Sequence, residues 1–241
     1  MPADPWILVL ALAITVAAGL VQGTIGFGLA VVSVPVLSLL DRDLAPVPQL
    51  LIALPLALAM VWREWRHLDL SGVGWVLAGR LPGAALGVLL LKLVSDTALD
   101  IIIAALVLVG VVIVASGVVI RLTPITKVTA GVASGTMGLV ASIGGPPLAL
   151  LYRDVEGGRL RSSLNAIFAI GIVFSIAVRS ATGEISGDDV KVGLVLLPAA
   201  FTGLWLSRFF TDQIEGAKLK NAVLAVSALA AVGLLLRTVL R

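Results

Sequence analysis

Polar side chains are scarce in this chain, and those that could do chemistry lie in two glycine-rich stretches inside long apolar blocks. Hydroxyl and amide groups can donate hydrogen bonds to the oxygens of an anion. They also bond readily to carbonyls of their own or neighbouring helices, so each residue taken alone has two equally good explanations. As a cluster at helix breaks they favour a binding site. The candidates are Gln22, Thr24 and Ser33 in the first stretch and Ser134, Thr136 and Ser142 in the second.

Glycines and prolines in the same stretches predict that a helix breaks there and a new helix begins. The first turn of the new helix has N–H groups without an internal acceptor and the positive end of the helix dipole, which suits an oxyanion. Pro146 or Pro147 fits such a helix start, since no N–H donor is needed there. The break glycines therefore join the candidate ligands: Gly23, Gly26 and Gly28, then Gly135, Gly144 and Gly145.

Arg80 and Asn165 also lie inside apolar blocks. An arginine within a span costs about 2.5–3.5 kcal/mol on insertion scales, so it suggests a function, here the charge balance of a bound anion. The alternative, slightly favoured, is that the span begins near Leu77 and Arg80 snorkels to the surface, where Trp75 also fits. Asn165 either faces the site or bonds between helices, and the sequence does not separate the two. Arg179 closes its block and is expected at the interface.

Acidic residues are missing from the middle of every apolar block, since all 14 fall in loops or near block ends. Proton-coupled carriers often use a carboxylate or histidine relay within the membrane. The only histidine, His67, lies in a charged loop and is expected to face solvent. We therefore expect transport driven by the anion gradient and the membrane potential. The chain has no cysteine, and its apolar blocks hold no nucleophile–base pair and no metal cluster. An intramembrane enzyme is therefore disfavoured, and no cofactor is expected.

The elements that position these residues are membrane helices. Apolar residues make up 59% of the 241 residues, charged residues 13%, and the mean hydropathy is +1.13, whereas a soluble domain carries about 25% charged residues. The net charge of +3 includes no basic run, so no nucleic-acid partner is expected. Spans need about 20 apolar residues. The sequence predicts eight apolar blocks, at 6–40, 44–62, 72–94, 97–120, 127–152, 162–180, 190–209 and 217–237.

The two glycine-rich stretches share a pattern that indicates an internal duplication. The spacing G-x3-G-T-x-G-x8-P occurs at 19–35 and again at 131–147, an offset of 112 residues. A second match, at an offset of 116, relates residues 81–90 to residues 197–206. Matches in the same order at nearly equal offsets indicate duplicated units, although apolar low complexity raises the rate of chance matches.

Each predicted repeat holds a broken helical hairpin and three transmembrane helices, the first over residues 1–122 and the second over 123–241. With Arg80 left out, full crossing of every block divides the lysines and arginines equally, eight on each face. Re-entrant hairpins that return to their starting face divide them ten to six. The positive-inside rule favours the hairpins and puts both termini outside the cytoplasm. The predicted fold is thus an all-α polytopic membrane protein with two inverted repeats, a common transporter architecture with its site near the midplane.

Two segments resemble the signatures of a known family. VQGTIGFGLAVVSVPVL at 21–37 is similar to the first signature of the sulfite exporter TauE/SafE family, also called the toluene sulfonate uptake permeases. GVASGTMGLVASIGGPPLALLY at 131–152 is similar to the second, and LPGAALG at 81–87 and the chain length agree. Many members carry three consecutive glycines in the first signature, where this chain has GFG.

The resemblance implies a multi-pass transporter in the cytoplasmic membrane of a bacterium or archaeon, acting on sulfite, an organosulfonate or a related sulfur anion. We expect an exporter whose partners are this small anion and membrane lipid, and a homo-oligomer is compatible with the sequence. An importer of the same ligands and a carrier of another small anion, such as a carboxylate, stay open. A purely structural membrane subunit would show continuous helices without polar breaks.

Overall fold

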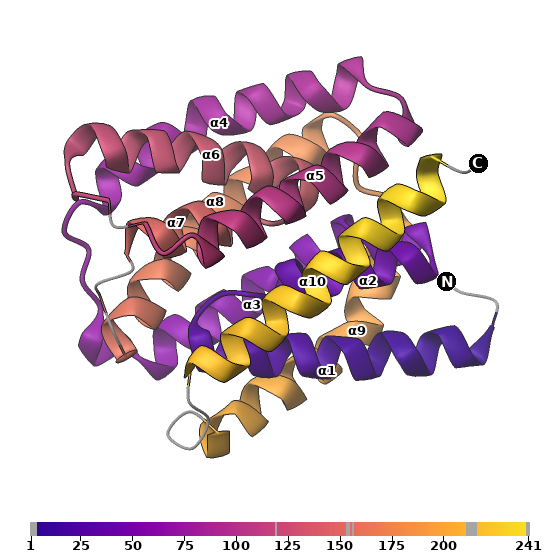
Figure 1. Cartoon of the computed structure of the whole chain (residues 1–241), viewed down its shortest axis with the longest axis horizontal. Helices are drawn as coiled ribbons and strands as arrows, with labels where there is room; N and C mark the ends of the chain where they lie inside the picture. Colours follow the sequence, from indigo (N-terminus) through magenta and orange to yellow (C-terminus); the bar gives the residue numbers. More distant parts are fainter. Residues whose placement is uncertain (1–3, 119, 153–154, 156, 211–215, 240–241) are drawn as a thin grey trace.

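The computed structural model describes residues 4–118, 120–152, 155, 157–210 and 216–239. Over these residues the fold is all helical, as predicted, and no strand is present (Figure 1). Two short 3-10 turns follow α2 and α3. The α-helices are α1 (Pro5–Ile25), α2 (Leu29–Leu40), α3 (Val47–Arg63), α4 (Val73–Leu93), α5 (Asp96–Ala115), α6 (Pro124–Ala141), α7 (Gly145–Leu151), α8 (Gly157–Ala181), α9 (Gly187–Phe210) and α10 (Gly216–Val239).

Six helical stretches among the described residues are long and apolar enough to cross a membrane, and they contain α1, α3, α4, α5, α8 and α9. Large apolar side chains such as Leu89, Val112 and Leu194 are more than half exposed on these helices or at their ends. Such side chains suit contact with lipid, since the backbone of each helix is satisfied internally. The chain is therefore a multi-pass membrane protein.

The first broken block divides into α1 and α2 around two glycines. Gly26 ends α1 with a φ of 99°, and Gly28 precedes α2 with a φ of 127°. Both values lie in the left-handed region, which a side chain disfavours and glycine adopts freely. The two helices then pack against each other. The chain thus reverses inside the apolar block where the glycines predict it.

The second broken block divides into α6 and the short α7. Ser142 ends α6 in the left-handed conformation with a φ of 61°, and the Ile143 N–H donates to the Met137 carbonyl at 3.1 Å. This bond closes the last turn of α6. Gly145 begins α7 and Pro146 follows in its first turn, where an N–H donor is not needed. Both predicted helix breaks are therefore present.

Glycines bring two pairs of helices into backbone contact, α1 with α9 and α4 with α6 (Figure 1). A Cβ on Gly19 would overlap the carbonyl of Ala200, and a Cβ on Gly203 would overlap that of Val16. Small residues let helices approach closely in lipid, where packing drives their association. The glycines that meet backbone across the α4–α6 contact are Gly79, Gly83, Gly131 and Gly135.

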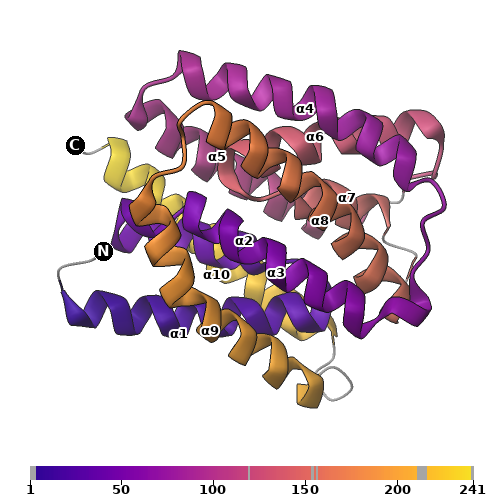
Figure 2. The ribbon, with the colours of Figure 1, turned by 180° about the vertical axis from the view of Figure 1, so that it is seen from behind.

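Among the other contacts, α3 packs on α8 (Figure 2) and α5 packs on α10. In the predicted duplication, α1 corresponds to α6 and α9 to α4, while α2 corresponds to α7 and α10 to α5. The pair α1–α9 therefore corresponds to the pair α6–α4, and the pair α2–α10 to the pair α7–α5. All four pairs are in contact. The first residues of α1 and the last residues of α10 lie at the same end of the molecule (Figure 1). The pairing suits a duplicated unit, while the inverted relation of the repeats stays a prediction. Residues 211–215 and 240–241 of the second repeat lie outside the described residues.

Candidate functional site

The two helix breaks meet inside the molecule. The ring of Phe27, from the first break, lies against Gly145, from the second. Beside this contact is a central cavity of about 510 Å³, counting its open mouth, which both breaks line together with α3, α4 and α8. Residues from both predicted helix breaks thus line one cavity. The predicted site residues that line it are Gln22, Gly28, Arg80, Ser142, Gly144 and Gly145.

Arg80 is buried in the bundle, with 5% of its surface exposed. Its Nη1 donates to Ser134 Oγ at 2.8 Å, and its guanidinium carbon lies 6.0 Å from the ring centre of Phe168. Nε has no hydrogen-bond partner, and no carboxylate in the described part of the chain lies within ion-pairing distance. The snorkelling interpretation is therefore wrong. The reason is that α4 turns Arg80 towards α6 and α8, and neighbours such as Leu81 face outwards.

Ser134 and Gly171 set the position of this guanidinium. Ser134 is fully buried, and its hydroxyl accepts from Arg80 and donates to the Gly144 carbonyl at 2.6 Å. The hydroxyl thus ties the guanidinium to the second break. On α8, a Cβ at Gly171 would overlap the guanidinium, so the glycine provides the space that the group occupies. Ser134 does not line the cavity and acts on the site through Arg80.

Gln22 and Asn165 hold the first break in place. The Leu29 N–H donates to Gln22 Oε1 at 3.1 Å, and Gln22 Nε2 donates to Asn165 Oδ1 at 2.8 Å. Asn165 Nδ2 donates to the carbonyls of Gly26, at 2.8 Å, and Arg161, at 2.7 Å. All these polar groups are therefore satisfied. Gln22 lines the cavity, whereas Asn165 bonds between helices, one of the two alternatives that the sequence left open.

The first turn of α2 lies beside the cavity. Leu29, Ala30 and Val31 form this turn, and all three line the cavity. N–H groups in the first turn have no acceptor within their helix. Gln22 satisfies the N–H of Leu29, which leaves those of Ala30 and Val31 beside the cavity at the positive end of the helix dipole.

The other predicted hydroxyls bond mainly to backbone. Thr24 donates to a carbonyl of its own helix, and Thr136 donates to the Gly83 carbonyl across the α4–α6 contact at 2.8 Å. Ser33 is fully buried and bonds to Gln49 Oε1 at 2.8 Å. Ser142 lines the cavity, although its hydroxyl donates to the Pro46 carbonyl at 2.9 Å.

The break glycines divide into two groups. Gly28, Gly144 and Gly145 line the cavity, as the sequence predicts for backbone that approaches a ligand. Gly23, Gly26 and Gly135 do not line it. A Cβ on Gly23 would meet the side chain of Ser207 on α9, one on Gly26 would meet Arg161 on α8, and one on Gly135 would meet the backbone of Arg80. These three glycines are positions of close packing around the site.

Several lining residues were missed by the sequence reasoning. Phe27 comes from the first break, and Phe168, Ile172 and Ser175 come from α8. The signal that could have found the α8 residues is their helical spacing from Asn165, because positions three, seven and ten residues along a helix lie close to one face. Residues of α3 also line the cavity, and no sequence signal identifies them.

Arg179 was expected at the membrane interface, and its depth in the membrane stays a prediction. The residue is 3% exposed, and its guanidinium donates to the carbonyls of Leu139 and Val140 in the last turn of α6. Carbonyls in a last helical turn lack internal donors, and a cation there also suits the negative end of the dipole. Arg179 is thus a buried cap of α6, unlike Arg80, whose Nε has no partner.

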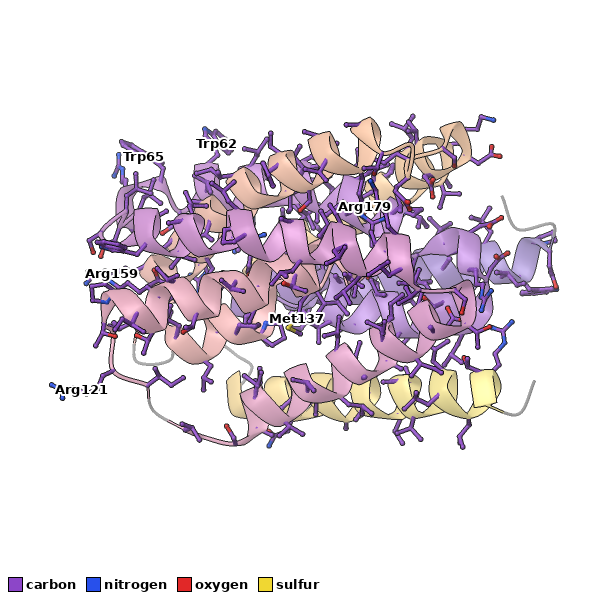
Figure 3. All side chains as sticks on the ribbon, turned by 90° about the horizontal axis from the view of Figure 1, so that it is seen from above. Trp62, Trp65, Arg121, Met137, Arg159 and Arg179 are labelled. Atoms are coloured by element: carbon purple, nitrogen blue, oxygen red, sulfur yellow. The ribbon has the colours of Figure 1, made fainter. Side chains whose placement is uncertain are left out.

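Charged residues gather at one end of the molecule, where Figure 3 shows Trp62, Trp65, Arg121 and Arg159. Arg159 pairs with Asp69 and lowers the pKa of that carboxyl to about 2. Nearby, Glu64 Oε1 lies 2.8 Å from Arg161 Nη2 and 3.7 Å from Arg63 Nε, and Arg63 also donates to the Gly23 carbonyl at 2.5 Å and to Ser207. The predicted exposure of His67 is confirmed, since 63% of its side chain is exposed.

The fold and the site define a polytopic helical membrane protein whose two broken helices meet at a buried, cationic cavity. This is the architecture of a membrane transporter. The family model of the sulfite exporter TauE/SafE matches residues 11–234. The chain therefore belongs to the sulfite exporter TauE/SafE family, a family of membrane transporters, as its signatures predict. No curated protein and no solved structure matches the chain.

Proposed function

We propose that the protein exports sulfite or a small organosulfonate across the cytoplasmic membrane and binds it in the central cavity. The observation that carries this proposal is Arg80, a buried cation whose Nε has no partner. A charge at membrane depth is expensive unless another charge balances it. An anion in the cavity supplies that balance. Membership of the sulfite exporter family supports a sulfur oxyanion as this ligand.

The donors around the cavity suit an oxyanion with three oxygens. The guanidinium of Arg80 carries the charge, and the N–H groups of Ala30 and Val31 add two neutral donors at a helix start. Among the described lining residues there is no aspartate or glutamate that would repel the ligand. Ser134 and Gln22 hold the donors in place through their bonds to Arg80 and Leu29.

The direction of transport follows from the charge of the ligand. A potential that is negative inside acts on a unit charge with about 2.3 kcal/mol per 100 mV, and it drives anions out of the cell. A proton relay needs a carboxylate or a histidine, and neither lines the cavity among the described residues. Export as a uniport down the electrochemical gradient is therefore the mechanism that we propose.

Sulfite flux in proteoliposomes tests the proposal. We expect flux without a pH gradient, and we expect it to rise when a potassium diffusion potential draws anions across the membrane. Thr136→Val serves as a control, since Thr136 does not line the cavity, and should keep the wild-type flux. Flux that appears only after a proton gradient is imposed would refute the uniport. Equal competition by acetate and by methanesulfonate would refute the preference for sulfur anions.

A further inference from the structure

A second cavity lies against Arg80 on the outer side of the bundle. This groove, between α4 and α8, has a volume of about 630 Å³ counting its open side. Its walls include Leu77, Leu81, Ile170 and Phe174. Leu81 is 52% exposed and Ile170 is 50% exposed. The groove therefore opens on the apolar outer surface of the protein.

Arg80 and Ser175 line both the groove and the central cavity, so the two spaces adjoin at these residues. The Arg80 side chain is buried, and its Nε has no hydrogen-bond partner. Gly171, on the α8 wall of the groove, leaves the guanidinium uncovered by any side chain at that position. The groove thus combines apolar walls with one cationic group at its inner end.

We propose that this groove holds the apolar group of an organic sulfonate whose charged group is bound at Arg80. The inference rests on the proposed function and narrows its ligand. An alkyl or aryl sulfonate has one anionic end and one apolar end, which match the guanidinium and the walls respectively. Sulfite has no apolar group, so it uses the guanidinium and leaves the groove to lipid chains.

The affinity of a series of alkylsulfonates tests this assignment. Methane-, propane-, butane- and hexanesulfonate would be titrated into the purified protein in lipid nanodiscs, with sulfite as the reference. Burial of one methylene contributes enough free energy for about a threefold to fourfold gain in affinity. We therefore expect the dissociation constant to fall by about this factor per added methylene until the groove is filled.

Three substitutions on α8 locate the effect. Ile170→Trp fills the groove from its rim, and we expect the gain per methylene to disappear. Val173→Trp is the matched control, because Val173 is 54% exposed on the same helix and does not line the groove. It should keep the wild-type dependence on chain length. Phe174→Ala widens the groove and should move the tightest-binding member to a longer chain.

The outcomes separate this inference from the function on which it rests. Equal affinities along the series in the wild-type protein overturn the groove assignment, and so does an unchanged gain per methylene in Ile170→Trp. If the gain in affinity per methylene persists in Arg80→Gln, the alkylsulfonates are partitioning into the lipid of the nanodisc. That result also overturns the groove assignment. If neither sulfite nor methanesulfonate binds the wild-type protein, the proposed function itself fails.

Discussion

Arg80→Met removes the buried charge and keeps a long, flexible side chain. A central arginine costs about 2.5–3.5 kcal/mol on insertion scales. The folded protein recovers about 1.5–3 kcal/mol through the charged hydrogen bond to Ser134, at 2.8 Å. Ser134 keeps its bond to the Gly144 carbonyl after the substitution, so no polar group is left unpaired. The insertion cost minus the free energy recovered from the hydrogen bond gives the expected change in stability. We therefore expect Arg80→Met to be at least roughly as stable as the wild type, and at most about 2 kcal/mol more stable.

The same substitution acts on transport in the opposite direction. Loss of one partner from a buried charge pair costs about 2–5 kcal/mol of binding free energy. At about 1.4 kcal/mol per tenfold change, the affinity for the anion falls by about thirtyfold to several thousandfold. Arg80→Met should therefore fold well and transport almost nothing.

Two measurements on one preparation check this prediction. Thermal unfolding in detergent gives the midpoint temperature, and sulfite flux in proteoliposomes gives the activity. Arg80→Lys keeps the charge without the planar fork and should lie between the wild type and Arg80→Met in flux. Normal flux in Arg80→Met would refute the argument. So would a midpoint several degrees below the wild type, because Arg80 would then be a structural group.

Three further changes test the supports of the site and the charged end. Asn165→Leu leaves the Gly26 carbonyl and Gln22 without their partner, so the protein should lose about 2–4 kcal/mol of stability in chemical unfolding. Arg179→Met uncovers two carbonyls in the last turn of α6 and should lower the unfolding midpoint, in contrast to Arg80→Met. Asp69 has its pKa lowered from 3.8 to about 2, so its contribution to stability is complete above about pH 4 and is lost as the pH falls towards 2. Asp69→Asn should remove this part of the acid dependence of the midpoint.

Each of these changes has its own control. Asn165→Gln, which keeps the amide, should restore part of the lost stability. Arg179→Lys should retain one bond to the uncovered carbonyls, and equal midpoints for both Arg179 variants would contradict the capping role. For Asp69, an unchanged acid dependence in Asp69→Asn would show that other carboxyls cause it.

The helix breaks were predictable because their cause is local. Gly26 and Gly28 adopt backbone angles that other residues avoid, and Gly145 with Pro146 starts a helix where no donor is needed. Hydropathy also suffices to identify spans, since each must be apolar over its whole length. The membrane helices and the position of both breaks therefore follow from composition and spacing alone.

The depth and direction of single side chains were not predictable in the same way. Average hydropathy over a window is the same whether Arg80 faces lipid or the bundle, and the structure turns it inwards. The partners of Arg179 were not predictable for a related reason, because the carbonyls that it caps belong to a helix about 40 residues away. The walls formed by Phe27 and Phe168 depend on how elements from both repeats meet. Contacts of this kind are set by tertiary packing, which spacing in one segment does not encode.

The glycine contacts of α1 with α9 and of α4 with α6 also bear on how the molecule can move. In these contacts backbone packs directly on backbone, so no flexible side chains lie between the helices that could let them slide. Each helix pair is therefore expected to behave as one rigid body. A transport cycle then has to rock these two bodies against each other. Between them lie the breaks, with Phe27 against Gly145. The surface that lines the ligand cavity would therefore also be the surface about which the two bodies move. Binding of the anion and opening of the cavity would then be coupled at the same residues.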